Sequence, residues 1–446
     1  MDKHLLKNRS IASEIINKSF KQNKRLSDVT SELLNKEKDR LSNHDKRFIT
    51  MLVQGTVRLS GRLEWELNNV FKGDLQDLKM NLRTLLQLGA YQLLYMDSVP
   101  DYAAVTTTVQ LAKKIHPNLA GITNALLRAL VNKDNYKHPN NKSPICELAA
   151  YLSHPEWLIK KWIKDRNYKY ACDLVKWNNS TPSYWFRTNS IQFPVKNFIS
   201  YLNEEKIEFC QFEHIQNYFK LNKNQKILQS KLFKKGNISL QDPAAGLVVK
   251  LLDPNSNESI IDACAAPGGK TSYIAEIMNN KGKITALDIN EKRLKILQNT
   301  INRLNITNVT IKLHDITASK ISKTSKMLLD VPCTGTGVLA KRADTRWRRN
   351  IDDILEMHLL QRKILWKASS HIKPGGILIY STCSIEREEN WMVIEAFLKT
   401  HPNFSIENAN NYIPKIFVDN KGALYTCPIK HKIDGGFAVR LKNNAS

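Results

Sequence analysis

The sequence predicts an α/β protein in which an all-α domain and a small α/β subdomain precede a doubly wound parallel sheet. Apolar positions in residues 1 to about 135 recur at helical spacing, without an alternating strand pattern. From Gln241 onward, short apolar runs alternate with helical segments, as in parallel α/β sheets. A chain of 446 residues is long enough for two or three domains with full cores.

The amino-terminal domain is expected to span residues 1–137. Helical periodicity is clearest in Asn81–Met96 and Gly121–Leu130, which predicts helices there. Residues 135–144 are polar and contain two prolines, and they are the best candidate for a linker.

The middle segment, residues 145–240, combines a helical connector with a small α/β subdomain. The connector is expected from Cys146 to about Trp177. Short β-like runs surround a helix-like stretch at Val195–Glu205, and this mixture predicts the subdomain.

The carboxyl-terminal domain, residues 241–446, contains the predicted parallel sheet. Its expected strands are Ser259–Ala263, Lys283–Ile289, Val309–Asp315, Met327–Val331, Gly376–Thr382 and Gly436–Lys442. No internal repeat or low-complexity tract interrupts this pattern.

The net charge of +25 favours a polyanionic partner, because lysines and arginines displace counterions from phosphates. An alternative is that drift in an AT-rich genome has raised the lysine content, since the chain is rich in Lys, Asn and Ile. The motifs below favour nucleic acid.

Composition also excludes several classes of protein. No apolar stretch is long enough to span a membrane, and the amino terminus lacks the apolar core of a signal peptide, so we expect a cytoplasmic protein without a membrane partner. Seven cysteines, an odd number, do not form a disulfide framework. No CxxC pair or Cys/His cluster has zinc spacing, so no metal site is expected.

Acidic residues end three successive predicted strands. Asp262 is followed by a small-residue loop and a helix that starts near Lys270; the loop is neither GxGxxG nor a P-loop. Asp288 and Asp315 end the next two strands, where acids can bind ribose hydroxyls and a nucleobase. Acids without a phosphate loop indicate a nucleoside without pyrophosphate, and S-adenosylmethionine is the expected cofactor. The alternative is that each Asp only caps a helix or turn.

Two cysteines follow apolar runs that are predicted to be neighbouring strands. Cys333 ends the segment Asp330-Val331-Pro332-Cys333, and Cys383 lies in Thr382-Cys383-Ser384. A thiolate that adds to carbon 6 of a pyrimidine turns carbon 5 into a nucleophile that can accept a methyl group. Asp330 could hold the Watson–Crick edge of the base. The alternative is a pair of buried free cysteines in a core.

Three segments resemble motifs I, IV and VI of the RNA 5-methylcytosine methyltransferases: DACAAPGGKT, DVPCTGTG and STCS. The resemblance implies that Cys383 is the nucleophile and that Cys333 assists proton removal or product release. It places Asp330 near both cofactor and base. One departure is Val331, where the family usually has Ala. The resemblance also implies a Rossmann-like fold whose cofactor-binding residues are Cys264, Ala265, Ala266, Pro267, Gly268, Gly269, Lys270, Asp288, Asp315 and Asp330.

The amino-terminal domain resembles the NusB family, a helical RNA-binding fold, in His44–Arg58 and Leu88–Val105. Fused to this catalytic unit, it implies an enzyme that methylates one cytosine of 16S rRNA, either naked or in an early assembling subunit. The subdomain in residues 145–240 is expected to bind RNA as well, and the protein to be a monomer.

A basic segment, KRADTRWRRN at residues 341–350, follows the first thiol motif. Arginines and a tryptophan together can bind a phosphate backbone and stack a splayed base. The alternative is a solvated helix start. The candidate RNA-binding residues are Lys341, Arg342, Arg346, Trp347 and Arg348.

Two other functions remain open from the sequence. The same core could methylate tRNA at cytosine carbon 5, or the chain could be a non-catalytic rRNA-binding factor in assembly or antitermination. The intact thiol pair and strand-end acids argue against the second alternative.

Overall fold

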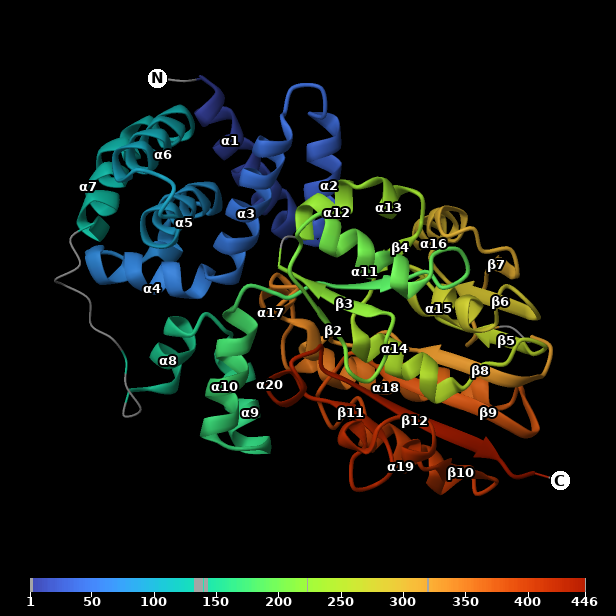
Figure 1. Ribbon diagram of the computed structural model, residues 1–446. Helices are drawn as coiled ribbons and strands as arrows, with labels where there is room; N and C mark the ends of the chain where they lie inside the picture. The colour runs from blue at the N-terminus through green and yellow to red at the C-terminus, as the bar shows by residue number, and fades with distance from the viewer. Residues whose placement is uncertain (1–2, 132–138, 140–142, 223, 319–320, 446) are drawn as a thin grey trace. The chain divides into compact units, whose positions relative to one another are not determined.

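The computed structural model describes residues 3–131, 139, 143–222, 224–318 and 321–445 (Figure 1). The chain forms two compact units, Met1–Ser180 with Leu339–Ile351 and Thr181–Val338 with Asp352–Ser446. This division differs from the expected boundaries, and the expected linker at residues 135–144 lies largely outside the described residues. Within the described ranges, no helix is both long and apolar enough to cross a membrane.

The first unit is helical throughout its described part. Its central helix, α5 (Met80–Tyr95), packs against five other helices of the unit, because apolar residues lie on nearly every side of it. The prediction of a helix here is confirmed. The remaining helices are α1 (Lys3–Lys21), α2 (Leu26–Lys36), α3 (Asn43–Arg58), α4 (Ser60–Val70), α6 (Asp101–Ile115), α7 (Ala120–Val131), α8 (Ile145–Tyr151), α9 (Glu156–Asp165), α10 (Tyr168–Asn179) and α17 (Thr345–Arg348).

The connector helices α8 to α10 belong to this unit because aromatic side chains join α8 to α4. The Tyr151 ring meets the Trp65 ring edge-on, with 5.3 Å between the centroids. The Arg62 guanidinium lies 3.5 Å from the centroid of the Tyr151 ring. These contacts join the connector to the helical unit, whereas the sequence prediction grouped it with the small subdomain.

The second unit begins with a small antiparallel sheet in the order β2-β3-β1-β4. Phe186, Phe198 and Phe219 form its buried core with neighbouring aliphatic side chains. The predicted α/β subdomain is present here. Its elements are β1 (Trp185–Thr188), α11 (Val195–Glu204), β2 (Phe209–Gln211), β3 (Tyr218–Leu221), α12 (Asn224–Gln229), α13 (Lys231–Lys234) and β4 (Ile238–Leu240).

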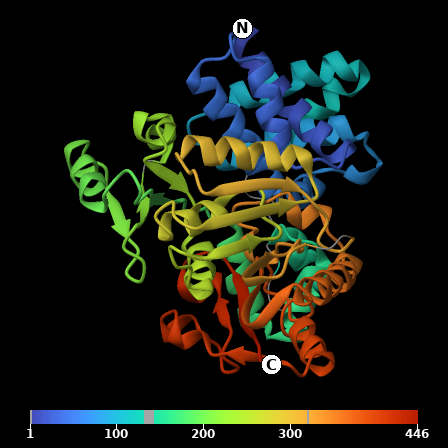
Figure 2. The same cartoon turned by 90° about the vertical axis from the view of Figure 1, so that its right-hand side faces the viewer.

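The large sheet of the second unit has eight strands in the order β10-β12-β9-β8-β5-β6-β7, with β11 paired to β12 (Figures 1 and 2). The five strands from β9 to β7 run parallel, and β12 and β10 are antiparallel additions. The strands are β5 (Ser259–Asp262), β6 (Lys283–Asp288), β7 (Val309–Leu313), β8 (Thr324–Asp330), β9 (Ile372–Thr382), β10 (Phe404–Glu407), β11 (Leu424–Thr426) and β12 (Gly436–Asn443).

Helices cover both faces of this sheet, as the doubly wound prediction requires. Ile260 and Leu328 belong to one buried cluster, whereas Ile261 and Leu329 belong to the cluster on the opposite face, because side chains alternate along a strand. The predicted fold class is confirmed. The helices are α14 (Pro243–Leu252), α15 (Gly269–Ile277), α16 (Glu291–Arg303), α18 (Asp352–Ser369), α19 (Trp391–Thr400) and α20 (Pro428–His431).

A fully buried ion pair joins the small sheet to a helix that covers the large sheet. Arg187 on β1 contacts Glu276 on α15, and both side chains have 0% exposure. The guanidinium also donates to Ser272 Oγ over 3.1 Å and to the carbonyl of Gly269 over 3.3 Å. Burial raises the pKa of Glu276 to about 7, although Arg187 opposes this rise. Arg187 therefore fixes the helix that begins at the predicted cofactor loop.

We predict that Arg187→Ala lowers the stability of the second unit by about 3–5 kcal/mol, because it leaves Glu276 buried without its partner. Thermal unfolding followed by circular dichroism measures the change. Lys169→Ala is the control, since Lys169 pairs with Asp173 at the surface and its loss should leave the midpoint unchanged. Equal midpoints for the two variants would contradict the prediction.

Candidate active site

The carboxyl ends of the parallel strands bring the two predicted thiols together. In the β8–β9 pair, Asp330 lies opposite Ser381, so the segments that follow both strands begin at the same edge of the sheet. Cys333 Sγ and Cys383 Sγ are 3.1 Å apart. This edge lies where β5 and β8 meet and the strand order reverses, which is where doubly wound sheets bind ligands.

The thiol pair is half-buried and shares a hydrogen bond. The bond to Cys383, followed by burial, raises the pKa of Cys333 well above its ordinary value. Cys333 therefore retains its proton near neutral pH. Since the thiolate is the nucleophilic form of cysteine, Cys333 is held in its less nucleophilic form.

A lysine and an aspartate lie beside the thiols. Lys270 Nζ is 2.6 Å from Asp330 Oδ2, and Ser381 Oγ donates to Asp330 Oδ1 over 2.9 Å. Burial alone would lower the pKa of Lys270. The charge and hydrogen bond of Asp330, with a smaller contribution from Cys383, outweigh burial, so the pKa of Lys270 is raised overall. The ammonium group therefore stays charged beside Cys383. The sequence placed Lys270 only at the end of the cofactor loop and did not predict this pairing.

A small hollow of about 70 Å³ opens beside Cys383 and Lys270. Its lining includes two acids, Asp242 and Asp434, that the sequence did not predict as site residues. The backbone N–H of Asp434 donates to Asp242 Oδ1 over 3.1 Å. The signal that could have identified them is their position in QDPAAG and DGGF, where each acid stands beside small residues.

The predicted cofactor acids differ in their surroundings. Asp288 has 3% exposure and accepts from the N–H of Ala266 over 3.2 Å and from that of Asn290 over 2.9 Å. Asp262 is fully buried and accepts from Thr271 Oγ1 over 2.7 Å. Burial raises the pKa of Asp262 to about 7. Its other oxygen, Oδ1, has no hydrogen-bond partner, which leaves an acceptor open at this loop.

Asp315 has a local role in the structure. It is exposed and accepts from both the N–H and the Oγ1 of Thr317, over 2.7 and 2.8 Å. These two bonds lower the pKa of Asp315. These bonds fit a turn cap, and the cofactor role of Asp315 stays a prediction.

The loop between β5 and α15 contains the remaining predicted cofactor residues, from Cys264 to Lys270. Gly268 adopts φ +99°, a conformation that side-chain-bearing residues rarely adopt. Burial raises the pKa of the Cys264 thiol, so this third cysteine stays neutral. Ile289, directly after Asp288, is 70% exposed, and such an exposed apolar side chain can cover a nucleobase. The sequence analysis did not select Ile289.

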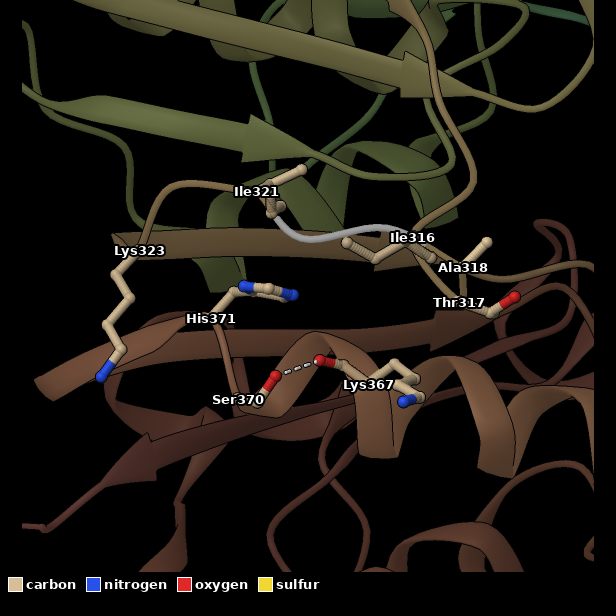
Figure 3. Close-up of a pocket in the computed structure, with 8 residues that line it drawn as sticks. All are labelled: Ile316, Thr317, Ala318, Ile321, Lys323, Lys367, Ser370 and His371. Carbon is tan, nitrogen blue, oxygen red and sulfur yellow. Dashed lines mark hydrogen bonds between the residues drawn. The ribbon is translucent and has the colours of Figure 1, made fainter.

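A larger hollow lies in the same unit, under the segment that precedes β8 (Figure 3). Its volume is about 460 Å³, and its described lining includes Lys323, Lys367 and His371. It contains neither thiol and none of the predicted acids among those lining residues. Size alone therefore does not identify the reaction site, because the reactive groups line the smaller hollow.

The basic segment that was predicted to bind RNA lies in the helical unit, as part of Leu339–Ile351. Arg346 is 1% exposed and donates to the carbonyl of Asn178 over 2.9 Å and to Asn179 Oδ1 over 2.6 Å, at the carboxyl end of α10. The end of a helix presents unpaired carbonyls that attract a cation. The prediction that Arg346 contacts RNA is corrected: the structure uses its guanidinium to anchor the chain.

The neighbours of Arg346 also bind protein groups. The Trp347 indole N–H donates to the carbonyl of Val57 over 2.8 Å, and Arg348 donates to Asn23 Oδ1 over 2.8 Å. The polar edge of the indole is therefore occupied by a protein group. Arg342 is exposed, and Lys341, Trp347 and Arg348 are half-buried. RNA contacts at these four residues stay predictions.

The fold and the strand-end site define a Rossmann-like methyltransferase, and comparison with known proteins specifies the family. The family described as 16S rRNA methyltransferase RsmB/F matches residues 249–442. The NusB family matches residues 6–132, and the ferredoxin-like domain described for RsmF/B-like methyltransferases matches residues 154–228.

Curated relatives extend this match to nearly the whole chain. The "Probable ribosomal RNA small subunit methyltransferase B" of Bacillus subtilis is 32% identical and covers 97% of this chain and 98% of its own. The "Ribosomal RNA small subunit methyltransferase B" of Proteus mirabilis is 33% identical, covering 91% of this chain and 95% of its own. The chain belongs to the family of small-subunit ribosomal RNA methyltransferases B.

Solved structures share the architecture. The crystal structure of PH0851 has a TM-score of 0.81 at 28% identity and covers 97% of this chain and 98% of its own. A methyltransferase homologue from Pyrococcus horikoshii has a TM-score of 0.58 at 28% identity, covering 68% of this chain and 99% of its own. The Pyrococcus horikoshii NSun6 structure with SFG, at 21% identity and a TM-score of 0.58 over 66% of this chain and 99% of its own, shares the fold.

We predict that Arg346→Ala lowers the stability of the helical unit by about 1–3 kcal/mol, because buried carbonyls lose their donor. The measurement is the thermal unfolding midpoint. Arg342→Ala is the matched control, since the Arg342 side chain is exposed and its removal should not move the midpoint. If Arg346→Ala unfolds at the wild-type temperature, the anchoring role is wrong.

Proposed function

We propose that this chain transfers a methyl group from S-adenosylmethionine to carbon 5 of a cytosine in 16S rRNA, through a covalent bond between Cys383 and carbon 6. The observation that supports this proposal most directly is the 3.1 Å separation of Cys333 Sγ and Cys383 Sγ, beside the Lys270–Asp330 ion pair. A simple core cysteine pair would not require a half-buried cation and a carboxylate next to it.

The cofactor-loop residues fit the proposed cofactor. Asp262 Oδ1 is a buried acceptor without a partner, which suits the ammonium group of an amino acid. Asp288 lies at the end of β6, where it can accept from ribose hydroxyls, and Ile289 offers an apolar surface to the adenine. S-adenosylmethionine, when bound, supplies an electrophilic methyl group. The loop from Cys264 to Lys270 and Asp288 would hold it.

The two thiols and the ion pair have different roles in the reaction on cytosine. The Cys383 thiolate adds to carbon 6, which makes carbon 5 nucleophilic, while Lys270 stabilises that thiolate by its charge. Asp330 accepts from the exocyclic amine of cytosine. Once carbon 5 bears the methyl group, a base removes the proton that carbon 5 still carries. The bond between Cys383 and carbon 6 then breaks, which restores the Cys383 thiolate and the aromatic ring. We assign assistance in this release to Cys333, whose sulfur lies beside that of Cys383.

The RNA substrate is inferred from the relatives and the charge. The matched relatives are named as ribosomal RNA small subunit methyltransferases, and the net charge is +25. A target base must leave its stack to reach a strand-end thiol, so an accessible loop or a flipped nucleotide is required. Either naked rRNA or an early assembling subunit can present such a nucleotide.

We predict that Cys383→Ala abolishes methyl transfer, with a loss of about 10³-fold or more, because the neighbouring Cys333 retains its proton and a thiol is a poor nucleophile. Radiolabelled S-adenosylmethionine and 16S rRNA provide the assay.

Bisulfite sequencing of RNA from a deletion strain assigns the substrate: loss of a mark in tRNA instead of 16S rRNA would favour the tRNA alternative. Full activity of Cys383→Ala would refute Cys383 as the nucleophile. Complete rescue of a deletion strain by an inactive Cys383→Ala protein would instead favour a non-catalytic factor.

We predict that Cys333→Ala accumulates a covalent RNA–protein adduct, because Cys383 still attacks but the product is not released. The adduct should appear as a retarded band on a denaturing gel. The control is Cys333→Ala combined with Cys383→Ala, which should give no band. A Cys333→Ala protein that methylates and releases RNA at the wild-type rate would contradict the release role.

A further inference from the structure

A buried carboxylate connects the two segments that contain the thiols. Glu389 has 0% exposure. Its Oε2 accepts from the backbone N–H of Thr334 over 2.8 Å, and its Oε1 accepts from Ser384 Oγ over 2.6 Å. Because Thr334 directly follows Cys333 and Ser384 directly follows Cys383, one side chain holds both neighbours of the thiol pair.

Further hydrogen bonds fix the same carboxylate. Gln361 Nε2 on α18 donates to Glu389 Oε2 over 2.9 Å and to the carbonyl of Pro332 over 2.9 Å. The Thr334 hydroxyl donates to Glu389 Oε1, and the Tyr380 hydroxyl donates to the backbone carbonyl of Glu389 over 2.6 Å. Glu389 is thus held from α18, from β9 and from the Cys333 segment.

The next residue, Asn390, fixes Cys383 from both sides. Thr382 Oγ1 donates to Asn390 Oδ1 over 2.6 Å, and Asn390 Nδ2 donates to the carbonyl of Ser384 over 2.9 Å. The backbone on either side of Cys383 therefore has little freedom to move away from Cys333.

Among the described residues, the hydrogen-bond donors to the Glu389 carboxylate include no cation. The donors that its carboxylate accepts from are a backbone amide, two hydroxyls and a side-chain amide, all uncharged. A negative charge close to a thiol disfavours the thiolate. After the hydrogen bond to Cys383, burial and the charge of Cys383, Glu389 is a further cause of the raised pKa of Cys333.

We propose that Glu389 is a positioning residue that clamps the two thiol segments at reacting distance, and that its carboxylate, held against the residue after each thiol, biases which of them ionises. This role rests on the proposed division of work between the thiols. The clamp supplies the geometry, and the charge acts on the proton that the two sulfurs share.

Other titratable groups surround the thiol pair and also shape its ionisation. Lys270 favours the thiolate, whereas carboxylates and neighbouring weak acids oppose it. Besides Glu389, the groups that lie around the pair are Lys270, Asp330, Asp242, Asp434 and Tyr380. A test must therefore change Glu389 without changing these groups.

Two substitutions separate geometry from charge. Glu389→Gln removes the charge but can keep the clamp, since its oxygen can accept from the Thr334 amide and Gln361 while its amide donates to the two hydroxyls. Glu389→Ala removes both. Glu395→Gln is the matched control, because Glu395 lies on α19 and pairs with Lys421 at the surface.

The first measurement tests the clamp in RNA-free protein. Diamide oxidises two neighbouring thiols to a disulfide and is itself reduced to the hydrazine, taking up the two protons and two electrons. Mass spectrometry of unreduced peptides follows the Cys333–Cys383 disulfide. We expect similar rates in wild type, Glu389→Gln and Glu395→Gln, and slower formation in Glu389→Ala. An unchanged rate in a folded Glu389→Ala protein would overturn the clamp.

The second measurement tests the charge. Iodoacetamide alkylates thiolates, so the ratio of Cys383 to Cys333 modification across pH reports which thiol ionises. We expect a strong preference for Cys383 in wild type and in Glu395→Gln, and a ratio reduced by about tenfold in Glu389→Gln, as a one-unit shift between the thiols would give. An unchanged ratio in Glu389→Gln would overturn the charge role, and loss of stability alone would not move it.

Neither measurement uses RNA or S-adenosylmethionine, so this inference and the proposed function fail separately. Methylation by Cys383→Ala would refute the assigned nucleophile whatever the alkylation ratio. Conversely, unaltered thiol behaviour in the Glu389 variants would refute the clamp even if Cys383→Ala were inactive.

Discussion

The parallel pairing of β8 with β9 is the constraint on which the rest of the site depends. Its register places Asp330 opposite Ser381, so two segments distant in sequence leave the sheet side by side. The thiols approach within 3.1 Å only because this register holds. Buried apolar side chains on both faces of these strands fix it, since a slip by one residue would turn every side chain to the other face.

Buried carboxylates in this unit are stabilised in different ways, and each way suits a different role. Glu276 pairs with Arg187 and joins two sheets. Asp262 has one hydroxyl donor and one open acceptor, which suits ligand binding. The described donors to Glu389 are uncharged, and its carboxylate lies against the segments that contain the thiols. Lys270 supplies the opposing positive charge next to Cys383, so the site contains both signs within a small, half-buried volume.

The sequence was a good guide to the large sheet and a poor one to the basic segment. Strands such as Ser259–Asp262 were visible because a buried parallel strand needs a continuous apolar run. The segment around Arg346 looked like an RNA contact because charge and aromatic content do not reveal what an arginine faces. Its acceptors are carbonyls at the end of α10, about 170 residues earlier in the chain, and no local pattern records them.

By itself, the sequence determined the fold class, the strand-end placement of Cys333, Cys383 and Asp330, and the family, because apolar periodicity and contiguous motifs are local properties. Only the tertiary structure decided the partners: that Lys270 pairs with Asp330, that Asp262 lies inside the protein, that Asp315 caps a turn, and that Glu389 joins the two thiol segments. These are contacts between segments far apart in the chain, or depend on burial. The fold creates them when it excludes water and brings donors to acceptors that the sequence leaves unpaired.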